Sequence, residues 1–170
     1  MFDDIIVNFL LLFVAVSPIS LIPIFASLTQ GLGKKDVKKI YLKAALVAFV
    51  VLSIFWLFGG NVLELMGISM SSFRIIGGLF LVAIAFQMVL EQRQGRRQHT
   101  ADVAMDDHSI HSIAIFPLAI PLIAGPGAMT ASLLLAESRV NTLLGFFISY
   151  LPIIAVVLIC LLYTSDAADE

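Results

Sequence analysis

The stretch IPLIAGPGAMT, residues 120–130, places two prolines and two glycines in an otherwise apolar run. A similar stretch, SPISLIPIFAS at residues 17–27, carries two prolines at the same spacing. Proline disturbs a helix because it lacks an N–H donor and clashes with the preceding turn. Adding 103 to the residue number aligns the two stretches and pairs Phe13 with Phe116, Pro18 with Pro121, Pro23 with Pro126, and Ser27 with Thr130.

The residues around both stretches are apolar enough to cross a membrane. Of 170 residues, 60% are hydrophobic and 13% are charged, and the mean hydropathy is +1.04. Soluble domains are about 45–50% apolar and about 25% charged, so the composition argues against a soluble globular enzyme. Several of the uncharged stretches exceed the roughly 18 residues of a membrane span; these stretches are 5–33, 44–63, 75–90, 108–136 and 140–165.

This pattern predicts an all-α fold, a polytopic transmembrane helical bundle, because the Phe- and Leu-rich runs lack the two-residue alternation of a membrane barrel strand. The acidic start MFDD argues against a signal peptide, so we expect a retained first helix. The predicted helices, with boundaries good to about 2–4 residues, are 5–28, 44–66, 68–90, 113–136 and 142–162.

The two proline stretches lie on predicted helices 1 and 4, which we expect to be broken. Three spans separate the copies, an odd number, so the copies cross the membrane in opposite directions, as in an inverted repeat. We expect a single membrane domain over 1–170, with one three-helix repeat over 1–95 and a truncated second repeat over 108–159. The chain would then hold five of six helices.

The last eleven residues, CLLYTSDAADE at 160–170, have a separate interpretation. They back-translate to the transposon end and adapter used in sequencing-library preparation, so we expect read-through rather than native protein. Such segments are excluded from fold reasoning. An ordinary acidic tail is the alternative.

The broken helices supply the predicted binding site. Paired glycines free the backbone from helical dihedrals, and proline leaves a carbonyl of the preceding turn without its donor. Half-helix ends carry partial charges that hold an ion or a polar solute, and Ser27, Thr29 and Ser132 add hydroxyls nearby. Alternatively, the prolines only kink helices for packing. The candidate substrate-binding residues are Ser17, Pro18, Ser20, Pro23, Pro121, Gly125, Pro126, Gly127 and Thr130.

Two charges and four glycines lie inside the predicted helices. Glu64 and Arg74 flank a tight hairpin at equal distances from Ser69, and we expect a structural ion pair that snorkels to the outer face. The alternative is a functional intramembrane pair. Small residues let helices approach closely in lipid, which is the role we expect for Gly59, Gly60, Gly77 and Gly78.

Several other functions have little support in the sequence. A net charge of −2 gives no reason to expect nucleic-acid binding, and the single Cys160 excludes an internal disulfide. Nucleotide-binding and hydrolase motifs do not occur, so we expect neither an enzyme nor a cofactor. The loop DDHSIH at 106–111, with His99 upstream, lacks a defined ligand spacing, so a solvated loop explains it better than a metal site.

Three stretches resemble the MarC family of bacterial integral membrane proteins. They are SPISLIPIFASLT at 17–29, FGGNVLELMGIS and FRIIGGLFLVAIAFQM within 58–88, and FPLAIPLIAGPGAMT at 116–130. They occur in family order, and the resemblance extends over nearly the whole chain up to Ile159. It implies a six-helix inner-membrane protein related to small-solute exporters such as the lysine-exporter group, with no known substrate. The chain departs from the family by ending after five predicted helices.

We therefore expect a secondary transporter or exporter of an unidentified small solute or ion. The site would lie where 17–23 meets 121–130, and one repeat would rock against the other around it. The lipid bilayer is an expected partner, nucleic acid is not, and homo-oligomer formation stays open. A non-transporting membrane scaffold or stress-response protein is the first alternative. An intramembrane enzyme is disfavoured, because no acid, base or metal cluster lies at membrane depth.

The basic residues predict how the chain is oriented. Eight of the ten Lys and Arg residues lie in segments 29–43 and 91–112, and the opposite face keeps only Arg74 and Arg139. Cytoplasmic loops of membrane proteins carry the excess of Lys and Arg. Both segments should therefore face the cytoplasm of a bacterial inner membrane, which puts the amino terminus in the periplasm.

Reporter tags test this orientation directly. A tag after Asp36 or Gly95 should report a cytoplasmic position, and a tag at residue 69 or 139 a periplasmic one. Labelling of a cysteine at position 95 by a membrane-impermeant reagent added outside the cell would contradict the prediction.

Overall fold

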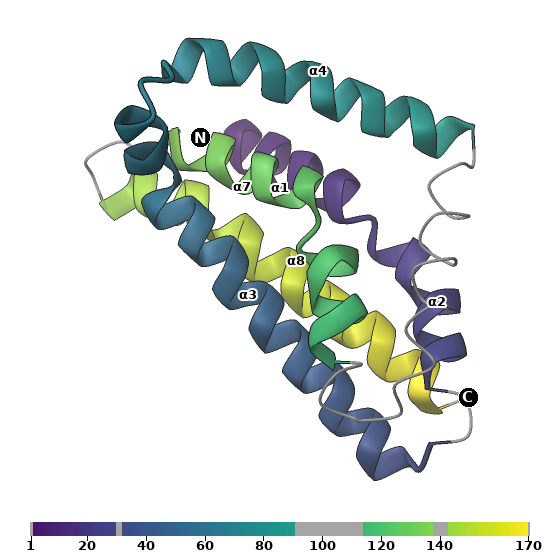
Figure 1. Cartoon of the computed structure of the whole chain (residues 1–170). Helices are drawn as coiled ribbons and strands as arrows, with labels where there is room; N and C mark the ends of the chain where they lie inside the picture. The colour runs from purple at the N-terminus through teal and green to yellow at the C-terminus, as the bar shows by residue number, and fades with distance from the viewer. Residues whose placement is uncertain (1, 30–31, 91–113, 138–142, 170) are drawn as a thin grey trace.

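The protein is a bundle of helices in a computed structural model that describes residues 2–29, 32–90, 114–137 and 143–169 (Figure 1). These ranges contain no β-strand, which confirms the all-α prediction. In chain order the elements are α1 (Phe2–Val16), the 3₁₀-helix η1 (Pro18–Ser20), α2 (Leu21–Leu28), α3 (Lys34–Leu65), α4 (Met70–Val89), the π-helix η2 (Ala114–Ile123), α7 (Pro126–Glu137) and α8 (Leu143–Asp169).

Both helix breaks that the prolines predict are present. The first predicted helix divides into α1, η1 and α2, and the fourth divides into η2 and α7. Within the described ranges, four segments are long and apolar enough to cross a membrane, and they cover 3–28, 34–65, 70–87 and 144–164. The fourth of the five predicted spans is divided by its break into η2 and the shorter apolar helix 126–136, so its crossing of the membrane stays a prediction.

Helix α3 begins ten residues before the predicted start at residue 44. The prediction placed the boundary at the lysine-rich segment, but the apolar periodicity of the buried face continues through that segment. The 32 residues of α3 give a length of about 48 Å, more than the roughly 30 Å of the hydrocarbon core. The lysines can therefore extend beyond the membrane while the same helix buries Val37, Ile40, Tyr41 and Ala44.

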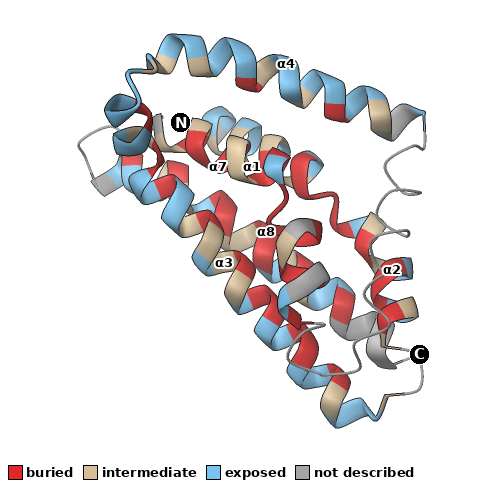
Figure 2. Ribbon diagram, viewed as in Figure 1, coloured by how far each residue is buried: buried red, intermediate tan, exposed pale blue. Residues whose placement is uncertain are grey.

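The core forms where α3 and α1 pack against α7 and α8. Figure 2 shows buried positions along the inner faces of α3 and α8, whereas α4 is largely exposed. In a membrane protein, an exposed apolar helix face is solvated by lipid tails, so burial inside the protein is not required. The largest fully buried side chains include Leu12, Phe25, Leu52, Leu118, Leu122 and Ile153.

Two hydrogen bonds connect α3 with its neighbours. Ser132 Oγ on α7 donates to the carbonyl oxygen of Leu52 across 2.7 Å in the buried interior. The hydroxyls of Ser53 and Tyr150 lie 2.9 Å apart and connect α3 with α8. The Tyr150 ring also packs on Trp56, with the ring centroids 4.8 Å apart. These contacts hold α3 in one register against both partners, since polar side chains in lipid stabilise helix pairs by bonding across them.

The glycine prediction is confirmed at two of four positions. A Cβ atom built on Gly59 would lie 2.7 Å from Leu133 Cδ1, and one built on Gly77 would lie 3.0 Å from Thr130 Cγ2. Both neighbours belong to α7, so α3 and α4 approach this helix through a glycine each. Gly60 has only Met70 Cε, at 3.9 Å, and Gly78 has nothing within 4 Å.

The fold leaves three predictions untested: the Glu64–Arg74 ion pair, the inverted repeat and the origin of segment 160–170. Glu64 lies in the last turn of α3 and Arg74 in the second turn of α4, both exposed, on either side of a turn in which Gly67 has φ +71°. Their pairing stays a prediction, as does the inverted repeat. Helix α8 continues to Asp169 through most of segment 160–170. A helical conformation does not test where that segment comes from, so its origin also stays a prediction.

Alanine substitution at the adjacent glycines tests the close packing of α3 on α7. Gly59→Ala should destabilise the protein by about 1 kcal/mol or more, because the added methyl overpacks the contact with Leu133. Gly60→Ala should be neutral or stabilising by up to about 1 kcal/mol, since alanine favours helix over glycine. Unfolding in mixed micelles would measure both, and equal effects would contradict the assignment.

Candidate functional site

The first helix break is centred on Ser17. This residue has φ 55° and ψ 66°, a left-handed conformation that a residue with a Cβ atom rarely adopts. Its N–H still donates to the Phe13 carbonyl at 2.8 Å, and its carbonyl accepts from the Ser20 N–H at 3.1 Å. The two hydroxyls lie 2.8 Å apart. Ser17 thus interrupts the regular helix, while these hydrogen bonds of the break are made within the chain.

The second break lies at residues 124–125, between η2 and α7. Pro121 lies inside η2, where the N–H of Ala124 donates to the Ala119 carbonyl at 2.8 Å in the wider π pattern. The Gly125 carbonyl accepts from the Met129 N–H at 2.9 Å. The predicted non-helical GPG segment is therefore shorter than expected, because Pro126 is the first residue of α7. Proline suits that position, since it has no N–H to satisfy there.

The two breaks come close together inside the bundle. A Cβ atom built on Gly127 would lie 4.0 Å from the Ala15 carbonyl oxygen, two residues before Ser17, and 2.5 Å from Ile84 Cδ1 of α4. The first turn of α7 therefore lies where α1 and α4 approach each other. The 103-residue alignment pairs Ser17 with position 120, whereas the second interruption falls at 124–125. The breaks are thus neighbours in space without being equivalent in sequence.

The hydroxyls predicted to bind a solute form hydrogen bonds within the protein. Thr130 Oγ1 donates to the Pro126 carbonyl at 2.9 Å, and Thr29 Oγ1 donates to the Phe25 carbonyl at 2.8 Å. Ser132, as described above, bonds to α3. In each case the hydroxyl donates its hydrogen to a backbone oxygen. These hydroxyls can therefore accept a hydrogen bond from a ligand but cannot donate one.

The other candidate residues divide between interior and surface. Ser17 and Pro18 are buried at the first break, whereas Pro23 is exposed in α2. Gly125 and Gly127 are buried and Pro126 is exposed. The structure therefore brings the first turn of α7 close to the end of α1, two residues before Ser17, whereas Pro23 lies at the surface. The side chain of Pro121 lies outside the described part, as do His99 and the loop 106–111.

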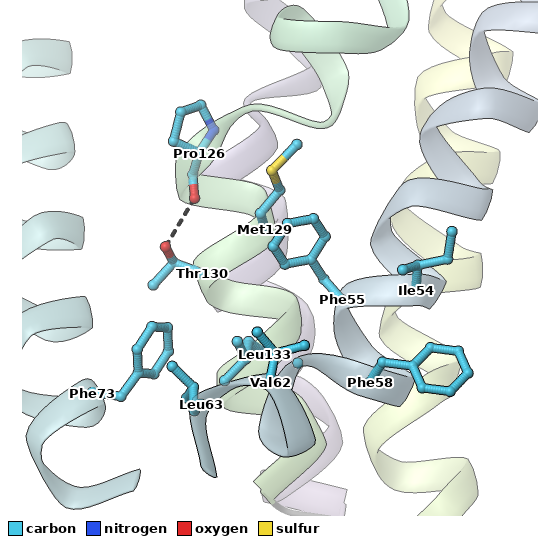
Figure 3. A pocket seen from close by; sticks show the side chains of 11 residues that line it. Ile54, Phe55, Phe58, Val62, Leu63, Phe73, Pro126, Met129, Thr130 and Leu133 are labelled. Carbon is cyan, nitrogen blue, oxygen red and sulfur yellow. Dashed lines mark hydrogen bonds between the residues drawn. The ribbon is translucent and has the colours of Figure 1, made fainter. Parts of the chain in front are cut away.

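A cavity of about 420 Å³ lies beside the α7 end of this region. Its walls come from α3, α4 and α7, and Phe55 reaches across toward Met129 (Figure 3). Of the predicted site residues that the structure describes, Pro126 and Thr130 line it. The remaining lining residues are Ile54, Phe58, Gly59, Val62, Leu63, Phe73 and Leu133.

Most residues of this cavity carry no distinguishing signal in the sequence. Apolar residues that face a cavity, a helix or lipid carry the same signal in a sequence, so only Gly59 stood out besides Pro126 and Thr130. The amide of Asn8 on α1 was also missed, and its buried Nδ2 has no hydrogen-bond partner within the described residues. Among those residues, no three His, Cys, Asp or Glu side chains gather into a group that could hold a metal ion.

Long apolar helices, with two interruptions that meet inside the bundle, define a polytopic helical integral membrane protein. The chain belongs to the MarC family of integral membrane proteins, whose family model matches residues 2–168.

Curated relatives come from archaea and bacteria. A UPF0056 membrane protein of Methanocaldococcus jannaschii is 38% identical over 89% of this chain and 66% of the relative. UPF0056 membrane protein YhcE of Escherichia coli is 35% identical over 83% of this chain and 66% of the relative. The chain spans from 54% to 66% of the length of the first relatives it matches. No solved structure matches it.

Substitutions at Ser17 test the left-handed conformation of the first break. Ser17→Ala and Ser17→Gly both lose the bond to Ser20, but only alanine keeps a Cβ atom in the strained conformation. The glycine variant should be more stable by up to about 1.5 kcal/mol, because strain of about 1–2 kcal/mol exceeds the entropic loss of roughly 0.4–1 kcal/mol from the more flexible glycine.

Ser27 inside α2 is the matched control, since it lies in an ordinary right-handed helix. There the order should reverse, with alanine more stable than glycine by about 1 kcal/mol. Chemical unfolding in detergent measures all four variants. The same order at both positions would contradict the assigned strain.

Proposed function

We propose that the protein is a secondary transporter or exporter of a small solute and that the region around the first turn of α7 is its binding site. The observation that carries the proposal is the approach of the two breaks, at Gly127 and Ala15. Interrupted helices that meet inside a bundle are how many transporters build a substrate site at the bilayer midplane.

The geometry gives α7 a position from which it can respond to a ligand. Its first turn contacts α4 through Gly127 and Thr130 and lies against the end of α1. The chain just before α7 is a π-helix followed by two non-helical residues, 124–125, rather than a continuous helix. Movement of α7 against α1 would then alternate access to the site, and the left-handed residue Ser17 would serve as the hinge on the other side.

The membrane and orientation form part of the same proposal. A bacterial inner membrane with the amino terminus in the periplasm follows from the asymmetry of Lys and Arg. The lysines in the first turns of α3 would then lie at the cytoplasmic surface. Solute would cross between that surface and the periplasmic end, near the turn between α3 and α4.

Efflux from proteoliposomes tests the proposal. Vesicles that carry the chain would be loaded with the small-molecule fraction of a bacterial extract, and release would be followed by mass spectrometry. At least one solute should leave faster than from protein-free vesicles. Gly127→Leu should slow that release at least tenfold, because a leucine side chain cannot fit between α7, α1 and Ile84.

Gly78→Leu is the matched control, since Gly78 lies in α4 with nothing within 4 Å of an added Cβ atom. This variant should transport at the wild-type rate. Release that never exceeds the protein-free rate, together with stable protein partners in a detergent pull-down, would favour a membrane scaffold. Equal loss in both glycine variants would contradict the site.

A further inference from the structure

The cavity beside α7 has a lining with almost no polar surface. Three phenylalanines contribute to it, Phe55 and Phe58 from α3 and Phe73 from α4. Among the described residues, no Asp, Glu, Lys, Arg or His lines it. A charged ligand would lose its hydration there without gaining a counter-charge, which is strongly unfavourable at low dielectric. The lining therefore selects against ions and zwitterions.

One side chain gives the cavity a polar contact. The Thr130 hydroxyl donates its hydrogen to the Pro126 carbonyl oxygen across 2.9 Å (Figure 3). A threonine hydroxyl has one donor and two acceptor lone pairs, so the group can only accept from a ligand. The Thr130 methyl packs toward Gly77, which fixes the rotamer. The cavity thus matches a ligand with one hydrogen-bond donor.

The size and position of the cavity suggest how a ligand reaches it. A volume of about 420 Å³ falls within the range of about 300–1,000 Å³ typical of small-molecule sites. Several lining residues are also on the outside of the bundle, since Ile54, Phe58 and Val62 are each about half exposed. The cavity is therefore open toward the surface that lipid covers. A hydrophobic compound dissolved in the bilayer could enter between α3 and α4.

We propose that this cavity binds an uncharged, largely hydrocarbon molecule with one hydrogen-bond donor, which enters from the bilayer. We also propose that the transported substrate is a molecule of the same chemical class, and this assignment rests on the proposed transport function. Hydrocarbon contact with the phenylalanines supplies the affinity, and Thr130 Oγ1 orients the polar end.

Photolabelling in liposomes tests the binding. The probe is a decanol analogue that carries a diazirine, and labelled peptides are located by mass spectrometry. Label should appear on the cavity segments of α3 and α7, and excess decanol should displace it. Decanoate and decylammonium have the same chain length but are charged, so they should not displace it. Uniform labelling of every lipid-facing helix, or equal displacement by all three compounds, would overturn the proposal.

Two valines of α3 provide matched variants. Val62 lines the cavity and Val50 does not, although their exposed fractions are similar at 50% and 44%. Val62→Phe fills part of the cavity and should lower displaceable labelling at least fivefold, whereas Val50→Phe should leave it within twofold of wild type. Equal labelling in the two variants would contradict the site.

Thr130→Val keeps the shape of the side chain but removes the hydroxyl. It should reduce the advantage of decanol over decane as a competitor, from at least fivefold to near unity. An unchanged preference for decanol in this variant would show that Thr130 does not receive the donor. The Thr130→Val measurement tests the binding site even if Val62→Phe fails to fold.

The proposed ligand class and the proposed transport function can be refuted independently of each other. Displaceable labelling of the cavity without solute efflux from any vesicle would retain the ligand class and refute the transport function. Efflux of a charged or polar solute that persists in Val62→Phe and with saturating decanol would retain transport and refute the ligand class.

Discussion

The structure depends on how the backbone hydrogen bonds are satisfied where helices are interrupted in a membrane. Lipid offers no hydrogen-bonding partner, so every N–H and C=O at membrane depth needs one within the protein. At the first break, Ser17 keeps its bond to the Phe13 carbonyl and accepts from Ser20. At the second break, the π pattern of η2 and the bond from Met129 to Gly125 do the same. At both interruptions these backbone bonds are made within the protein.

This requirement also explains what the site region contains. Hydroxyls that a sequence would assign to a solute are used to satisfy carbonyls, as with Thr130 on Pro126 and Ser132 on Leu52. The hydroxyl hydrogens are thereby unavailable to the neighbouring cavity, whose described lining is aromatic and aliphatic apart from the Thr130 side chain. A proline-rich break in a membrane helix is thus compatible with an apolar site as well as with an ion site.

Helix α7 is the element on which the other helices converge. Leu133 of α7 packs on Gly59 of α3, and Thr130 of α7 packs on Gly77 of α4. In turn, Ile84 of α4 packs on Gly127 of α7. Glycine contacts bring backbones together where no hydrophobic effect drives helices to associate. Because α4 is otherwise largely exposed, its attachment to the bundle depends heavily on these few contacts. The cavity lies in the space that remains between α3, α4 and α7.

The sequence by itself determined the helical membrane class, both breaks and the glycine contacts at Gly59 and Gly77, because proline, glycine and apolar runs act locally along a chain. It did not determine where α3 begins. The lysines mark where the apolar membrane span starts, but the helix starts earlier, and Val37 and Ile40 are buried among those lysines. Only the tertiary structure decided that Gly127 approaches Ala15 and that Phe55 and Met129 share a cavity. The physical reason is that an apolar side chain has the same local preferences whether it meets lipid, another helix or an empty space, and only packing distinguishes these environments.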